Sequence, residues 1–220
     1  MNATSRALPE PHAGGSVRVV SGASPWPARF AWWTWFACIP LVFLGGSVTS
    51  TGAGLAIDGW WVVDPGKGDW FLPLYPLENW IHAQGPFVEH THRLCGMLVG
   101  VLSIATVVSA FVSGARTLGR VLACAGLAAV IVQGTLGGFR VLEKSRDLAF
   151  LHGAVGQGVF ALLGVAALAL AVRVPPVATN AELAKLRRVA LATTFVVYAQ
   201  IVVGAWLPIY AVIYFGARLL

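Results

Sequence analysis

Residues 88–115 read VEHTHRLCGMLVGVLSIATVVSAFVSGA and join a cluster of ionisable side chains to a long apolar run. After Arg93 the run carries no charge, and it is about as long as the roughly 20 residues that cross a bilayer as a helix. The cluster consists of Glu89, His90, His92 and Arg93. Ionisable groups inside a membrane are energetically costly and usually mark a functional site. This stretch therefore predicts a membrane helix with a candidate site near one end.

Four further charge-free runs have membrane-spanning length, namely residues 30–48, 121–139, 148–172 and 189–217. Only 11% of the residues are charged and the mean hydropathy is +0.75, whereas about 25% of the residues of a soluble domain are charged. Pro208 interrupts the last run, so we expect its helix to end near Trp206. The sequence predicts an all-α, polytopic membrane protein, with a four-helix transmembrane bundle and a fifth helix.

The distribution of charge orients these segments in the membrane. We expect a disordered cytoplasmic tail at residues 1–28, the bundle at 29–173, a cytoplasmic loop at 174–188, and the fifth helix with an incomplete tail at 189–220. If the spans alternate, one side carries Arg6, Arg18, Arg29, Arg116, Arg120, Arg173, Lys185, Arg187 and Arg188. Cytoplasmic flanks have such an excess, so the N-terminus is predicted to be cytoplasmic. This bias explains the pI of about 9.7 and argues against nucleic-acid binding.

Helical geometry divides the ionisable cluster between two faces. At 100° per residue His90 lies about 200° from His92, so the two histidines cannot enter one pocket. The alternative to a functional role is extension toward water, which suits His90 and Arg93. Glu89 and His92, three residues apart, share a face. That face continues with Cys95, Gly96, Val99, Gly100 and Ser103, which suits either close helix packing or a flat, bulky ligand.

A second histidine has a matching position in another predicted span. His152 lies about five residues inside its span, as His92 does, and both spans run inward from the outer side. At 1.5 Å per residue the two imidazoles have nearly equal depth. Gly96 and Gly156 each follow a histidine by four residues. Two parallel helices with histidines at one level predict axial ligands that clamp a metalloporphyrin iron, and the alternative is a separate interhelical hydrogen bond for each histidine.

Other metal sites fit the sequence less well. The ExxH pattern of Glu89 and His92 is half of a di-iron carboxylate site, but no second ExxH is present. The HExxH pattern of zinc proteases is absent. A haem could also use basic residues near the outer end for its propionates, because arginine pairs bidentately with carboxylates. The candidates are Arg93, Arg140, Lys144 and Arg146, and the last three are equally consistent with solvated surface.

The odd-numbered spans carry a repeat at their outer ends. The first ends FLGGSVTSTGAGL, the third VQGTLGGFRV and the fifth AQIVVGAWL. Each contains a step of small residues, and Gln133 and Gln200 precede these steps by four positions. The odd spans therefore supply glycine-rich ends for close packing, and the second and fourth spans supply the histidines.

Four motifs in order along the chain resemble the haem A synthase family of cytochrome oxidase biogenesis. They are GGSVTSTGAGLA, the E-x-x-H-R of Glu89, His92 and Arg93, QGTLGGFRV, and LAFLHGAVGQ with His152. The resemblance covers about residues 35–172. It implies an eight-helix protein of two four-helix halves that converts haem O to haem A by oxidising a ring methyl to a formyl group. It also implies that His92 and His152 hold the substrate haem and that Glu89 is the essential carboxylate.

The chain departs from the family pattern at two places. Thr49 stands where the family often has arginine, and the sequence after Trp206 does not follow the family. The helices of the C-terminal half, which hold a haem b in the family, are not expected here. We interpret the chain as a half-size form that pairs with itself or with a second membrane subunit, as a fragment, or as a frameshifted reading.

We therefore predict a haem A synthase-like oxidoreductase, multi-pass in a cell inner membrane, with a bacterial source favoured. Glu89 is the predicted catalytic residue, His92 and His152 are the iron ligands, and Arg93 and Arg140 contact the haem. The substrate is haem O, with haem b as the other haem considered, and the partners are membrane lipid and a second subunit. Two alternatives remain, namely a non-catalytic b-type haem or electron-transfer protein and an inactive synthase half. Glu89 has an alternative role as a helix N-terminal charge favoured by the macrodipole.

Overall fold

The computed structural model describes residues 18–19, 24–173 and 181–207, and this part of the chain contains five long helices. They are α1 (Trp26–Ser50), α2 (Gln84–Val112), α3 (Thr117–Leu142), α4 (Arg146–Ala171) and α5 (Ala181–Trp206). All five are long and apolar enough to cross a membrane. The predicted all-α membrane fold is therefore confirmed, and the chain is a multi-pass membrane protein.

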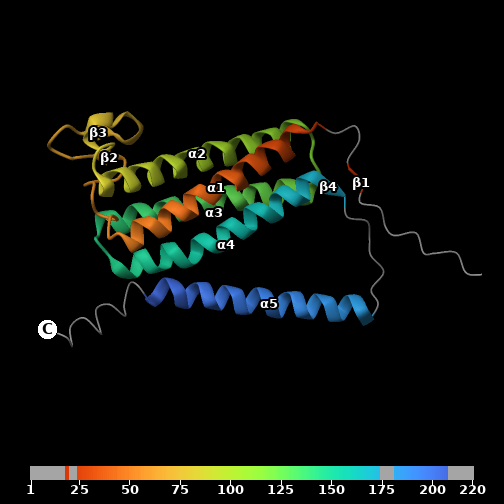
Figure 1. Ribbon diagram of the computed structural model, residues 1–220. Coiled ribbons are helices and arrows are strands. Elements are labelled where there is room, and N and C mark those ends of the chain that lie inside the picture. Colours follow the sequence, from red (N-terminus) through yellow and green to blue (C-terminus); the bar gives the residue numbers. More distant parts are fainter. Residues whose placement is uncertain (1–17, 20–23, 174–180, 208–220) are drawn as a thin grey trace, which may run out of the picture.

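Helices α1 to α4 form an antiparallel bundle (Figure 1). Helix α1 packs against α2 and α4, and α3 packs against the same two helices. Consequently α2 and α4 are diagonal neighbours that run in the same direction. The central core contains Cys38, Val99, Val159 and Leu163. Trp35 stacks on Phe160 beside this core, with ring centroids 5.1 Å apart.

Helix α5 lies along α4, apart from the centre of the bundle (Figure 1). The hydroxyl of Tyr198 donates to the carbonyl of Ala154 at 3.0 Å, and most α5 side chains are exposed. The helix ends at Trp206, as predicted, but it begins at Ala181 and not at residue 189. The charge-free run marks only the apolar part of a span, and the helical backbone continues through charged residues beyond it.

The connection between α1 and α2 folds as a cap at the end of the bundle that is predicted to lie outside. Its short strands β2 (Val62–Val63) and β3 (Trp70–Phe71) pair in antiparallel fashion, and 3-10 turns follow at Leu72–Leu74 and Leu77–Asn79. We call residues 51–83 the outer cap. Its buried centre consists of Ile57, Val63 and Leu72, and Met97 of α2 packs against that centre. The cap thus covers the end of α2 that carries the ionisable cluster.

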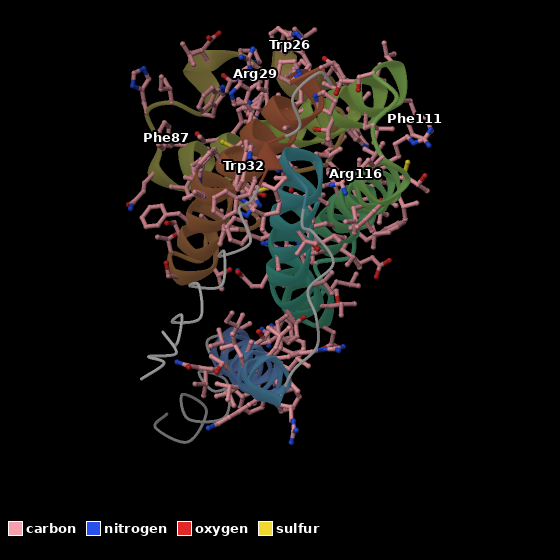
Figure 2. The ribbon with its side chains drawn as sticks, turned by 90° about the vertical axis from the view of Figure 1, so that its right-hand side faces the viewer. Trp26, Arg29, Trp32, Phe87, Phe111 and Arg116 are labelled. Carbon is pink, nitrogen blue, oxygen red and sulfur yellow. The ribbon has the colours of Figure 1, made fainter. Side chains whose placement is uncertain are left out.

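Arginines gather at the opposite end, which faces the viewer in Figure 2. Arg29 lies over the ring of Trp26 at 5.2 Å, and Arg120 lies over Phe111 at 5.5 Å. Arg116 donates to the carbonyls of Ala169 and Val172 at the end of α4. Strands β1 (Arg18–Val19) and β4 (Val172–Arg173) pair at this end. Residues 1–17 and 20–23 of the predicted tail, residues 174–180 of the predicted loop, and residues 208–220 lie outside the described residues.

Candidate functional site

The structure brings His92 of α2 and His152 of α4 together across the bundle. Their ring centroids are 6.3 Å apart and their planes are 83° from parallel. The two histidines can lie at the same depth because α2 and α4 run in the same direction, as the sequence predicts. Within the described residues no group of three or more His, Cys, Asp or Glu side chains could hold a metal ion. The histidine pair therefore suits a metal that already carries other ligands.

Both imidazoles are held through the same ring nitrogen. Nδ1 of His92 lies 3.1 Å from the carbonyl oxygen of Leu41, and Nδ1 of His152 lies 3.1 Å from that of Gln133. A carbonyl oxygen only accepts hydrogen bonds, so these two contacts are hydrogen bonds when Nδ1 carries the ring proton. Nε2 then carries the lone pair in both rings. A backbone acceptor on one ring nitrogen is the usual way in which a protein prepares the other nitrogen as a metal ligand.

A glycine supports each ring from the neighbouring helix. A Cβ atom at Gly45 would lie 3.0 Å from Cε1 of His92, and one at Gly137 would lie 2.9 Å from Cε1 of His152. Each glycine lies four positions, about one helical turn, after the residue whose carbonyl accepts from its histidine. In α1 and α3, therefore, the glycines and carbonyls of the repeat contact the two histidines.

The sequence predicted close-packing glycine ends but did not predict this contact with the rings. The sequence feature that could have indicated this contact is the recurrence of Leu-Gly-Gly at residues 44–46 and 136–138. Gln133, which lies next to His152, was visible in the repeat but had no predicted partner.

Glu89 and Arg93 are buried together under the outer cap. Oε2 of Glu89 accepts from the backbone N–H groups of Ala56 and Ile57 at 2.7 and 3.0 Å. Oε1 accepts from Arg93 at 2.6 Å, and the side chain is almost fully buried. Arg93 also donates to the carbonyls of Ile57 and Gly59. The alternative in which Arg93 extends toward water is wrong, because the cap supplies acceptors that bury the guanidinium.

Arg140 of α3 also contacts the outer cap. Its Nη2 donates to the carbonyl of Gly54 at 2.8 Å, and a Cβ atom at Gly54 would overlap its guanidinium. The indole of Trp60 lies directly against Gly138. Three of the charged residues predicted for the site, Glu89, Arg93 and Arg140, thus hold the cap over the bundle. Lys144 and Arg146 are exposed in the α3–α4 turn.

His90 is separated from the histidine pair, as the helical angle predicts. It is only 1% exposed, and its ring lies 4.6 Å from that of Trp80 and 5.4 Å from that of Tyr75. The alternative of extension toward water is wrong for His90 too, because the cap covers this face of α2. Tyr75 itself donates to Asp64 at 2.7 Å. Burial, together with this hydrogen bond, raises the pKa of Tyr75 to about 12.

Glycines below His92 leave space in the bundle. Cβ atoms at Gly96 and Gly100 would meet nothing within 4 Å. The GxxxG pattern therefore does not mark a close contact between described helices. At the corresponding place below His152, a Cβ atom at Gly156 would lie 2.9 Å from Nε2 of Gln133.

The fold and this site define a multi-pass membrane protein with two histidines facing each other in a helical bundle. The model of the COX15-CtaA family, described as cytochrome oxidase assembly protein, matches residues 79–215, more than half of the chain. The chain belongs to this family, which implies a role in cytochrome oxidase assembly. The matched range passes Trp206, after which the sequence was expected to depart from the family, and it leaves out α1. No curated protein and no solved structure matches the chain.

Proposed function

We propose that the protein binds haem O between His92 and His152 and oxidises a ring methyl group to a formyl group, giving haem A for cytochrome oxidase. The observation that carries the proposal is the facing histidine pair, in which a backbone carbonyl and a glycine hold each ring in the same way. The proposal extends the family's role in cytochrome oxidase assembly to a particular reaction.

The distance between the two rings suits an iron atom between them. With metal–nitrogen bonds of about 2 Å, each ring centroid would lie about 3 Å from the metal, so the two centroids would be about 6 Å apart. The measured separation is 6.3 Å. A porphyrin supplies the equatorial ligands itself, so two axial histidines complete the coordination of its iron. The space beside Gly96 and Gly100 favours a flat ligand at this level of the bundle.

Arginines at the outer end favour an acidic ligand edge. Arg140 uses only Nη2 in its bond to Gly54, and a guanidinium has five N–H donors. Arg93 uses Nη1 and Nη2 toward the cap and Glu89. We therefore assign Arg140 the main contact with a haem propionate, and Arg93 a contact that competes with the cap carbonyls.

Glu89 is the proposed proton acceptor. Oxidising the methyl group to a formyl group takes the oxygen atom from water, releases protons from the carbon and from that water, and passes the electrons to an acceptor outside this chain. Every hydrogen-bond partner of Glu89 in the described residues is a donor. A carboxylate one helical turn before the candidate ligand His92 is placed to take such a proton.

A non-catalytic b-type haem protein is the second candidate. The observation in its favour is that Glu89 makes its described hydrogen bonds to the cap and Arg93, and none to His92. Such bonds suit an anchor of the cap. An electron carrier needs two axial histidines and no acid beside them, so the role of Glu89 separates the two functions.

Expression with a haem O supply, followed by extraction and chromatography of the bound haems, tests the proposal. We expect haem A from the wild type, and haem O without haem A from Glu89→Gln, whose amide oxygen can still accept a bond from the cap. His82→Ala is the control, because His82 is exposed in the cap. If the wild type yields only unmodified haem, the second candidate is correct and the synthase proposal is wrong.

We also propose an inner-membrane location with the N-terminus in the cytoplasm, because Arg29, Arg116 and Arg120 gather at one end of the bundle.

One chain should hold one haem, because the other described histidines, His82 and His90, lie in or under the cap. The exposed Gln200–Gly204 face of α5 supports pairing with a second copy or another membrane subunit. The haem iron content per chain measures the number of haems, and the molar mass in detergent measures the pairing.

A further inference from the structure

The two histidine units differ at the residue that supplies the backbone carbonyl. That residue is Leu41 for His92 and Gln133 for His152. The side-chain Nε2 of Gln133 lies 2.7 Å from the carbonyl oxygen of His152 and 3.1 Å from its Nδ1. His152 therefore has a side-chain partner at the position where His92 has only a leucine.

The bonds between Gln133 and His152 are reciprocal. The ring Nδ1–H donates to the carbonyl of Gln133, so Nδ1 has no lone pair to accept a bond from the Gln133 amide. The amide instead donates to the carbonyl of His152. One bond holds the ring to the backbone of α3, and the other holds the backbone of α4 to the side chain of α3. Together they fix both the ring and the helix that carries it.

Gly156 provides the room for this arrangement. It lies one turn after His152, and a Cβ atom there would lie 2.9 Å from Nε2 of Gln133. At the equivalent Gly96 a Cβ atom would meet nothing within 4 Å. Two residues of the second unit, Gln133 and Gly156, thus form a contact that the first unit does not have.

We propose that Gln133 is a positioning residue for His152, so that the two candidate iron ligands are held unequally, His152 at two points and His92 at one. The consequence for haem rests on the proposed function, whereas the hydrogen bonds do not. His92 is then the ligand that yields first, and it lies on the helix that carries Glu89. The carboxylate of Glu89 and the more easily released iron ligand therefore lie on the same helix, α2.

The first test uses the full chain in lipid nanodiscs without haem. Nitrogen-15 NMR of histidine-labelled protein distinguishes protonated from unprotonated ring nitrogens, and single substitutions assign the signals. In Gln133→Leu, which copies Leu41, we expect the His152 ring signals to shift and broaden while those of His92 stay unchanged. Thr194→Leu is the control, because Thr194 is an exposed polar residue of α5 outside the Gln200–Gly204 face. Identical His152 signals in the two variants would overturn the proposal.

The second test measures haem loss from protein loaded with haem O. Removing a partner of a metal-ligating histidine typically costs about 10–100-fold in affinity, so we expect about tenfold faster loss in Gln133→Leu than in Thr194→Leu. Gln133→Met, which preserves side-chain length, should behave like Gln133→Leu. Equal rates in all three variants would refute the positioning role. If the wild type binds no haem but the NMR signals change, the proposed function is wrong and the assignment of Gln133 to His152 stands.

Discussion

The hairpin of α1 and α2 and the hairpin of α3 and α4 hold a histidine in the same way, but only the first carries charged residues next to its histidine in the sequence. Three residues before each histidine stand Glu89 and Ala149, and one residue after stand Arg93 and Gly153. The first hairpin has the outer cap as its connection, whereas a short turn links α3 to α4. The segments that recur in both hairpins thus provide the two histidines. The outer cap, Glu89 and Arg93, which do not recur, provide the charged and covered side of the site.

Glu89→Ala makes the first hairpin resemble the second and should have the largest effect on stability. It leaves Arg93 buried without its carboxylate and removes the acceptor of two cap N–H groups. Removing one partner of a buried ion pair costs about 3–5 kcal/mol. We expect faster protease cleavage of the cap and a lower unfolding midpoint in detergent. Glu78→Ala, an exposed change in the cap, is the control, and equal sensitivity of the two variants would contradict the anchoring role of Glu89.

Gly138→Ala should detach the cap from the second hairpin with a smaller loss of stability. The added methyl group would overlap the indole of Trp60, and overpacking of this kind typically costs about 1–3 kcal/mol. Tryptophan fluorescence and cap proteolysis would measure the displacement. Gly134→Ala is the matched control on the same helix, because a Cβ atom there meets nothing within 4 Å. A cap that is equally resistant in both variants would show that Trp60 does not need Gly138.

Alanine at the two supporting glycines tests whether the hairpins are equivalent. Gly45→Ala and Gly137→Ala each place a methyl group closer to an imidazole carbon than ordinary van der Waals contact, so the rings must tilt. We expect each to speed haem loss by about tenfold, at the low end of the range for residues that orient a metal ligand. Gly46→Ala and Gly134→Ala should leave the rate unchanged. Normal haem retention in the first two variants would mean that the glycines do not position the rings.

The pH dependence of the cap should give the smallest effect. The pKa of Tyr75 is raised to about 12 in the folded protein, from an ordinary value of about 10. The neutral phenol is therefore stabilised by folding, and this contribution is complete below pH 10 and is lost as the pH rises toward 12. Tryptophan fluorescence should report a loosened cap over that interval in the wild type. Tyr75→Phe should remove the part of the transition that depends on Tyr75, and an unchanged profile would refute the assignment.

The sequence predicted the spans and the histidine pair but not the cap. Charge-free runs set the five helices, and His92 and His152 could be paired because their distances from the span ends are local quantities. The start of α5 was misjudged because helices continue past their apolar part. The burial of His90 and Arg93 depends on cap residues far away in the sequence, whose fold has no periodic signal. Gln133 was visible in a repeat, but only the packing of α3 on α4 identifies its partner.

The absorption spectrum of the haem-loaded protein tests the histidine pair most directly. We predict a Soret band with one haem per chain in the wild type, and its loss or disruption in His92→Ala and in His152→Ala. His90→Ala and His82→Ala should retain the band, because these residues lie under or in the cap and not between α2 and α4. Equal loss of haem in His90→Ala and His92→Ala, or full retention in His152→Ala, would contradict the assignment of His92 and His152 as the two iron ligands.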